Sequence, residues 1–193
     1  MAEPVQGWAA FLRGINVGGK RKVPMDELRA FFAELGASDV RTYIQSGNVA
    51  FRAGEALARE IAEGFADRAE ARFGFAVPSA LRSAKELQAV LTGNPFLAGG
   101  ADEKALHVLF LTGEPDPAAV AALDPQRSAP DAFAVRGREI YLHLPNGVAR
   151  TRLTNAYFDA ALATTSTGRN WRTVRTVAEL LPVRVAPPGG AAG

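Results

Sequence analysis

The order in which segments of strand-like and helix-like hydrophobic period follow one another is the feature of the sequence that most constrains the fold. Residues 8–13 predict a strand, in which Trp8, Ala10 and Leu12 lie on one face and alternate with Ala9, Phe11 and Arg13 on the other. Residues 24–36 place apolar side chains three or four positions apart, which predicts a helix that Gly36 ends. Two alternating runs around the Ser46-Gly47 turn predict a hairpin, residues 55–73 a longer helix and residues 75–81 an edge strand.

The order strand, helix, strand, strand, helix, strand is that of a ferredoxin-like unit. After a helix at 83–92 the order recurs more loosely: a strand at 105–111, a helix at 116–123, a hairpin at 132–144, a helix at 154–162 and a last helix at roughly 169–181. The sequence therefore predicts an α+β fold with two ferredoxin-like subdomains, each an antiparallel sheet with helices packed on one face. The expected divisions are 1–82 for the first subdomain, 83–104 for a helix and connector, 105–182 for the second subdomain and 183–193 for a flexible tail.

Length and composition restrict the class of protein. A chain of 193 residues with 48% hydrophobic content can bury a substantial core, as one domain or two small ones. It has no cysteine, which excludes disulfides and thiolate catalysis. We expect no membrane span, because no apolar stretch reaches eighteen residues, and no signal peptide at the N-terminus. A cytoplasmic location is therefore expected.

Charge is unevenly distributed along the chain, although the net charge is only +2. Residues 1–25 carry +3 and residues 140–178 carry +4, so the rest of the chain carries −5. A bias of the genome toward Arg could explain why most of these cations are Arg, but it does not explain why acids are missing around them. The two basic segments suggest an anionic partner.

Residues 14–21 read GINVGGKR and match seven of the eight positions of the phosphate-binding loop G-x-x-x-x-G-K-[ST]. Arg21 stands where a hydroxyl would ligate magnesium, and the helix begins several residues too late to hold the phosphates at its N-terminus. These departures argue against a nucleoside triphosphatase. Two interpretations stay open: a metal-free anion-binding loop, or a plain glycine turn with solvated charges.

Topology places this loop beside the hairpin turn. The first two strands of a right-handed β-α-β crossover run parallel, so their carboxyl ends lie at the same edge of the sheet. Backbone amides, an ammonium, a guanidinium and neutral donors at one edge suit a phosphate or another anion. The candidate ligand-binding residues at this edge are Arg13, Asn16, Gly18, Gly19, Lys20, Gln45, Ser46 and Asn48.

Three stretches of the chain resemble an uncharacterised bacterial family, domain of unknown function 1697. They are FLRGINVGGKRKVPMDELRAFFAELGASDVRTYIQSGNVAF, LPNGVARTRLTNAYF and TGRNWRTV, and the resemblance runs from about Trp8 to Leu181. It implies two ferredoxin-like subdomains and no established activity. Arg169 and Asn170 match the last motif and join the candidate ligand-binding residues, whereas Gly168 stands where family members typically carry Thr.

Other catalytic patterns are missing from the sequence. His107 and His143 fall in predicted strands, where structural histidines are the usual case, and no Asp/Glu/His cluster has the spacing of a metal site. Ser46 has no adjacent base, and no acidic pair is spaced for acid/base work. We expect no metal and no cofactor, and the sequence identifies no catalytic residue.

The leading hypothesis is a cytosolic protein that binds a phosphorylated or carboxylated small molecule at the loop and the turn. The alternative is a nucleic-acid-binding module that stacks bases on an open sheet face. That face would carry Phe11, Arg13, Arg41, Tyr43, Gln45 and Arg52, while Trp8, Leu12, Val40, Ile44, Val49 and Phe51 would face the helices. A module that binds only other proteins is a third possibility, and the oligomeric state is left open.

Overall fold

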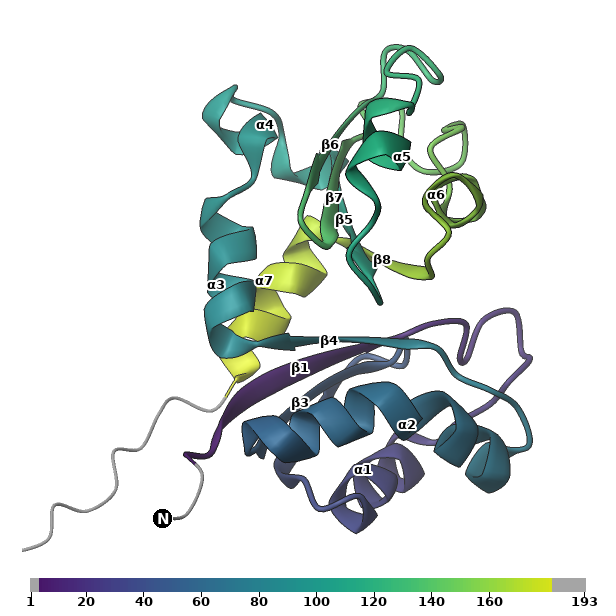
Figure 1. Ribbon diagram of the computed structural model, residues 1–193, viewed down its shortest axis with the longest axis vertical. Coiled ribbons are helices and arrows are strands. Elements are labelled where there is room, and N and C mark those ends of the chain that lie inside the picture. The colour runs from purple at the N-terminus through teal and green to yellow at the C-terminus, as the bar shows by residue number, and fades with distance from the viewer. Residues whose placement is uncertain (1–3, 182–193) are drawn as a thin grey trace, which may run out of the picture.

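Four strands and two helices form the first half of the chain, as seen in a computed structural model that describes residues 4–181 (Figure 1). The strands are β1 (Gln6–Leu12), β2 (Ser38–Tyr43), β3 (Asn48–Ala53) and β4 (Ser79–Ser83), in the antiparallel order β2-β3-β1-β4. The helices α1 (Met25–Glu34) and α2 (Glu55–Phe73) lie on one face of this sheet. This is the ferredoxin-like arrangement that the sequence predicts.

The second half repeats the arrangement. Its strands are β5 (Leu106–Leu111), β6 (Ala132–Arg136), β7 (Glu139–His143) and β8 (Ser166–Asn170), in the equivalent order β6-β7-β5-β8. Its helices α5 (Pro117–Ala121) and α6 (Asn155–Leu162) cover one face. The α+β fold with two ferredoxin-like subdomains is therefore confirmed, while the subdomain boundaries stay a prediction and the tail at 183–193 lies outside the described residues.

The linking elements are α3 (Ala84–Thr92), α4 (Pro95–Ala98), a 3-10 turn η1 (Glu103–Ala105) and the last helix α7 (Trp171–Leu180). In each half a polar residue at the end of the fourth strand caps the following helix. Ser83 accepts a hydrogen bond from the amide of Glu86 in a capping box, and Asn170 accepts one from the amide of Thr173. The two halves therefore share the full order βαββαβα.

Strand β8 is missing from the sequence-based prediction, which extends the last helix back to residue 169. The strand reads STGRN, with no alternating apolar side chains. Its placement comes from pairing with β5, from Leu111 opposite Ser166 to His107 opposite Asn170. Long-range pairing thus overrides a weak local signal.

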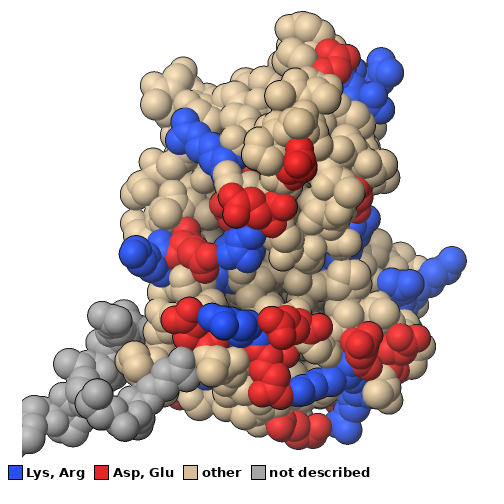
Figure 2. All heavy atoms as spheres, viewed as in Figure 1, with Lys and Arg blue, Asp and Glu red and all other residues tan. Residues whose placement is uncertain are grey.

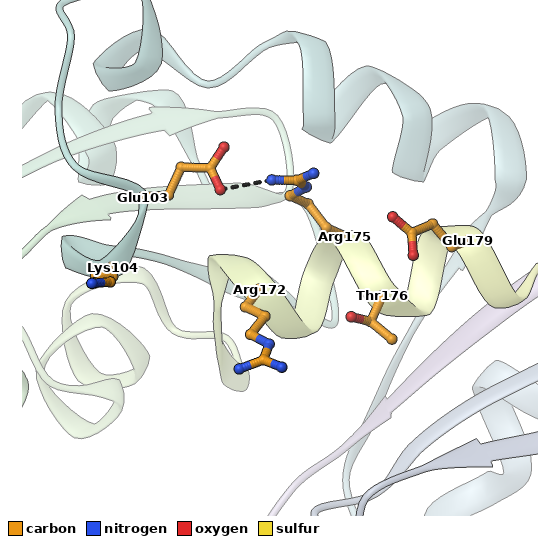
Figure 3. A pocket seen from close by; sticks show the side chains of 6 residues that line it. All are labelled: Glu103, Lys104, Arg172, Arg175, Thr176 and Glu179. Atoms are coloured by element: carbon orange, nitrogen blue, oxygen red, sulfur yellow. Dashed lines mark hydrogen bonds and ion pairs between the residues drawn. The ribbon is translucent and has the colours of Figure 1, made fainter.

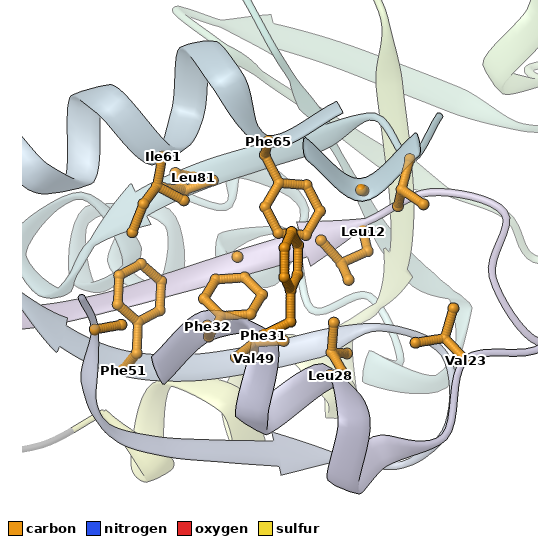
Figure 4. Packing of buried hydrophobic residues seen from close by; sticks show 14 of the residues in the cluster. Leu12, Val23, Leu28, Phe31, Phe32, Val49, Phe51, Ile61, Phe65 and Leu81 are labelled. Atoms are coloured by element: carbon orange, nitrogen blue, oxygen red, sulfur yellow. The ribbon is translucent and has the colours of Figure 1, made fainter. Parts of the chain in front are cut away.

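The core of the first half lies between its sheet and α1 and α2 (Figure 4). Phe32 lies between Phe51 and Phe65, with ring centroids 5.2 Å from each, so aromatic rings from the sheet and both helices meet at one point. Ile44 departs from the prediction that it faces these helices. It lies in the β2–β3 turn with φ 49° and is 53% exposed.

A second core joins the two halves. The sheet face opposite α1 and α2 packs against α3, α7 and the corresponding face of the second sheet. At its centre the rings of Phe11 and Phe110 stack with centroids 4.0 Å apart and planes inclined by 6°. These two residues occupy equivalent places, since Phe11 pairs with the first residue of β3 and Phe110 with the first residue of β7. The halves therefore meet as two similar surfaces, with equivalent residues in contact at the centre.

The stacked phenylalanines provide a test of this interface. Both rings are fully buried, so Phe110→Ala should lower the free energy of unfolding by about 3–5 kcal/mol, measured by urea denaturation. Val17→Ala is the control, because Val17 is 66% exposed and its truncation should change stability by less than about 0.5 kcal/mol. Equal stability of the two variants would contradict a packed interface.

Candidate anion-binding site

The Gly/Lys loop is held in a curled shape by the side chain of Asn16. Its Nδ2 donates to the carbonyls of Val23 and Gln45, both at 2.9 Å, and its Oδ1 accepts from the amide of Val23 at 2.8 Å. Gly14, Gly18 and Gly19 have φ between 58° and 73°, which glycine adopts without strain. The structure therefore brings the loop next to the hairpin turn, as the topology predicts.

A hollow of about 490 Å³ lies between this loop, the turn and the start of α1. Of the predicted residues, Asn16, Gly19 and Gln45 line it. Lys22 lines it as well, and sequence reasoning missed this residue because the phosphate-loop pattern directs attention to Lys20. The sequence signal that could have identified Lys22 is its position three residues before Met25, the first residue of α1.

The first turn of α1 opens into the same hollow. Its N-cap is Pro24, which makes no side-chain cap, so the first amides of the helix are not satisfied by a capping side chain. Such a helix start favours an anion. Asp26 also lines the hollow, and its carboxylate pairs with Arg29. The Arg29 guanidinium thus partly offsets the negative charge of Asp26 there.

Three further predicted residues are exposed near the hollow without lining it. Gly18 and Lys20 lie in the loop, and Ser46 lies in the turn. A Cβ built on Gly18 or Gly19 would meet no atom within 4 Å, so the loop backbone is open to an approaching group. Arg21 lies with its guanidinium 5.5 Å from the centre of the Phe75 ring.

Arg169 is buried between the two halves and is fully used there. Its Nη2 donates to the carbonyls of Leu12, Ser46 and Gly47 at 2.7–3.1 Å. Its Nε donates to Asn48 Oδ1, so this predicted residue is engaged with it and is also buried. Burial lowers the pKa of Arg169 to about 10, which leaves the group charged at neutral pH. Both side chains are thus engaged in the interior, and a ligand-binding role for Arg169 and Asn48 stays a prediction.

Arg13 and Asn170 also make internal contacts. Arg13 pairs with Asp159 and donates to the carbonyl of Ser166 at 3.1 Å, which joins the end of β1 to the second half. Asn170 caps α7 through its Oδ1. Neither residue lines the hollow at the loop. The site that the geometry retains consists of the loop, the turn and the first turn of α1.

Arg82 is the counterpart of Arg169, and the sequence offers no sign of its role. It is 1% exposed on β4 and donates to the carbonyls of Leu111 and Arg138 and to the carboxylate of Glu139 at 2.5–3.0 Å. Burial lowers the pKa of Arg82, against the effect of Glu139. Each half thus sends one arginine from its fourth strand into the other half.

The sheet face proposed for stacking bases is not open. Phe11 is fully buried against Phe110, and Tyr43 packs against the same core. On the face seen in Figure 2, Lys and Arg lie beside Asp and Glu instead of forming a patch of one sign. The stacking surface required by the nucleic-acid hypothesis is therefore covered by the second half.

Another hollow, of about 370 Å³, lies between η1 and α7 (Figure 3). Arg172 and Arg175 belong to the second basic segment of the sequence. Arg175 donates to the carboxylate of Glu103 at 2.7 Å, and Glu179 lines the same hollow. Both signs of charge line this hollow, as they line the hollow at the loop. The two differ in that Asn170 caps the start of α7, whereas the first turn of α1 has no side-chain cap.

Residues 4–181 contain no group of three or more His, Asp or Glu side chains that could hold a metal ion. Within the same range no helix is long and apolar enough to cross a membrane.

Substitution of Arg169 separates a structural role from a ligand-binding one. Arg169→Met leaves the Ser46 carbonyl and Asn48 Oδ1 without a donor and removes one of two donors from the carbonyls of Leu12 and Gly47, so the free energy of unfolding should fall by about 3 kcal/mol or more. Lys20→Met is the matched control, and an exposed loop lysine should change stability by less than about 0.5 kcal/mol. Urea denaturation measures both, and equal midpoints would contradict the structural role.

Comparisons with known proteins agree with this architecture. The sequence profile of DUF1697, a family of proteins of unknown function, matches residues 5–141. This confirms the resemblance seen in the sequence, although the motifs at 144–158 and 167–174 lie beyond the matched range. The solved structure of the conserved bacterial protein SP0830 from Streptococcus pneumoniae is similar over 91% of this chain and 98% of its own, with 26% identity and a TM-score of 0.71. No curated protein matches the chain.

Proposed function

The chain belongs to the family of unknown function DUF1697, and we propose that it binds a phosphorylated or carboxylated small molecule at the hollow beside the Gly/Lys loop. The observation that carries the proposal is the first turn of α1, which has no side-chain cap and opens into a hollow lined by Lys22 and Gly19. Helix amides and a lysine are the groups that bind oxyanions in other proteins. The expected cytoplasmic location is part of this proposal.

Each part of the hollow has a distinct role in the proposed complex. Lys22 supplies the charge, and Lys20 adds to the positive potential of the loop from its exposed position. Gly19 allows the ligand to approach the backbone, because it has no side chain and the space that a Cβ would occupy there is open. Gln45 supplies a neutral side-chain amide from the turn. The backbone carbonyl of Gln45 accepts a hydrogen bond from Asn16, which holds the turn in place. Arg21 supplies no metal ligand, so binding does not depend on magnesium.

A thermal-shift screen tests the proposal because a ligand of the native state raises the melting temperature. The probes are inorganic phosphate, a sugar phosphate, a nucleoside monophosphate and citrate, each with and without magnesium. We expect at least one to stabilise the protein. Its affinity should fall by about 1.5–3 kcal/mol in Lys22→Ala, which removes a charged hydrogen-bond donor.

Lys85→Ala is the matched control, because Lys85 is exposed on α3, away from the loop. It should leave both the melting temperature and the ligand affinity unchanged. If no anion shifts the melting temperature, or if both lysine variants bind equally well, the loop is a solvated turn and the proposal is wrong.

A further inference from the structure

A separate hollow of about 320 Å³ lies on the second sheet, on the face that α5 and α6 cover only in part. Its floor consists of side chains that are at most 4% exposed, from β5, β7 and the segments after β7: Leu109, Leu142, Leu144 and Leu153. No charged side chain lines it among the described residues. An apolar floor of this size fits a small ring.

Gly168 forms part of the wall through its backbone alone. It lies in β8 opposite Leu109 and is exposed. A Cβ at this position would lie 3.0 Å from Leu109 Cδ2 and 3.5 Å from Asn155 Oδ1. Leu109 and Asn155 line the hollow too, so any side chain at residue 168 would reduce the space.

Two amide side chains at the hollow have hydrogen-bonding groups left over. Asn155 donates from Nδ2 to Ser166 Oγ at 2.8 Å, which leaves its Oδ1 as an acceptor. Asn170 accepts from the amide of Thr173 with Oδ1, which leaves its Nδ2 as a donor. Asn155 Oδ1 as an acceptor and Asn170 Nδ2 as a donor therefore border the apolar floor.

The imidazole of His107 adds a neutral aromatic ring to the lining. Burial lowers the pKa of His107, with a smaller opposing effect from the Ala105 backbone, so the ring is uncharged at neutral pH. Its Nδ1 is buried and has no hydrogen-bond partner within residues 4–181.

The equivalent corner of the first half also has a hollow, of about 370 Å³, but charged side chains of α2 and α3 line it together with Trp8 and Leu81. Trp8 takes the place of His107, since Trp8 pairs with the helix cap Ser83 as His107 pairs with the helix cap Asn170. The Trp8 indole donates from Nε1 to the carbonyl of Ala53 at 3.1 Å. Leu81 takes the place of Gly168 by the same register, in which Leu81 pairs with Ala10 and Gly168 with Leu109. The second half thus has a smaller ring and no side chain where the first has an indole and a leucine.

Val148 lies at this hollow and is 60% exposed, although a valine gains stability from burial. A single exposed valine is ordinary by itself. At the border of an apolar floor, it provides surface that a bound ring would cover.

We propose that this hollow binds an uncharged heteroaromatic ring of nucleobase size, packed on the leucine floor beside His107. The edge of the ring pairs with the free acceptor of Asn155 and the free donor of Asn170. The site is independent of the anion site, because it lies in the other half of the chain and carries no charge.

Nuclear magnetic resonance of the whole chain, labelled with nitrogen-15, tests the proposal with adenine and nicotinamide as probes and benzoate as a charged ring of similar size. We expect saturable shifts in the amide signals of Leu109, Gly168 and Asn170 with adenine or nicotinamide, and at least tenfold weaker binding of benzoate. Absence of saturable shifts at these amides with both neutral rings would overturn the proposal, as would equal binding of benzoate.

Two variants test the location of the ring. Gly168→Thr fills the space beside Leu109 and Asn155, and should weaken binding at least tenfold. Val148→Asp places a charge at an exposed position, where folding is not at risk, and should weaken binding at least fivefold. Val17→Asp is the matched control at an exposed valine of the other half and should bind as the parent does. Parent-like affinity in Val148→Asp would overturn the proposal, even if Gly168→Thr fails to fold.

Discussion

The exchange of two buried arginines between the halves is the interaction on which the rest of the structure depends. Arg82 extends from β4 to the end of β5 and the β6–β7 turn, and Arg169 extends from β8 to the end of β1 and the β2–β3 turn. A buried guanidinium is costly unless its hydrogen-bonding groups are satisfied. Here backbone carbonyls and the Glu139 carboxylate satisfy Arg82, while backbone carbonyls and the side chains of Asn48 and Thr167 satisfy Arg169. Each guanidinium also lies 5.5–5.6 Å from a ring of the Phe11–Phe110 stack. The two arginines together therefore fix the position of one half relative to the other.

This exchange also bears on the proposed anion site. Arg169 holds the carbonyls of Ser46 and Gly47 from the interior, while Gln45 of the same turn borders the hollow. On the other side, Asn16 ties the Gly/Lys loop to Gln45. The turn is thus fixed by an arginine of the second half and an asparagine of the first. A rigid turn lowers the entropy that a ligand must overcome when it orders its site.

The sequence predicts the local elements well and the contacts between halves poorly. Helix α2 has the predicted bounds, because Gly74 ends it in the left-handed conformation and its apolar residues recur with helical spacing. Strand β8 and the orientation of Ile44 escaped prediction, since one depends on pairing with a distant strand and the other on a turn. The two basic segments suggest an anionic partner. Arg13 and Arg169 instead pair with groups of the other half. These partners are far away in the sequence, so no local pattern predicts them.

The two tryptophans allow a direct measurement of this coupling, since Trp8 lies in β1 of the first half and Trp171 begins α7, which follows β8 and packs in the core between the halves. Trp171→Phe leaves only the first reporter and Trp8→Phe only the second. In urea the fluorescence transitions of these two variants should coincide at one midpoint while both arginines are present. When Arg82→Met and Arg169→Met are added to each, the two midpoints should separate. Separate midpoints with both arginines in place, or a single shared midpoint after both are removed, would contradict the claim that the exchanged arginines join the halves into one folding unit.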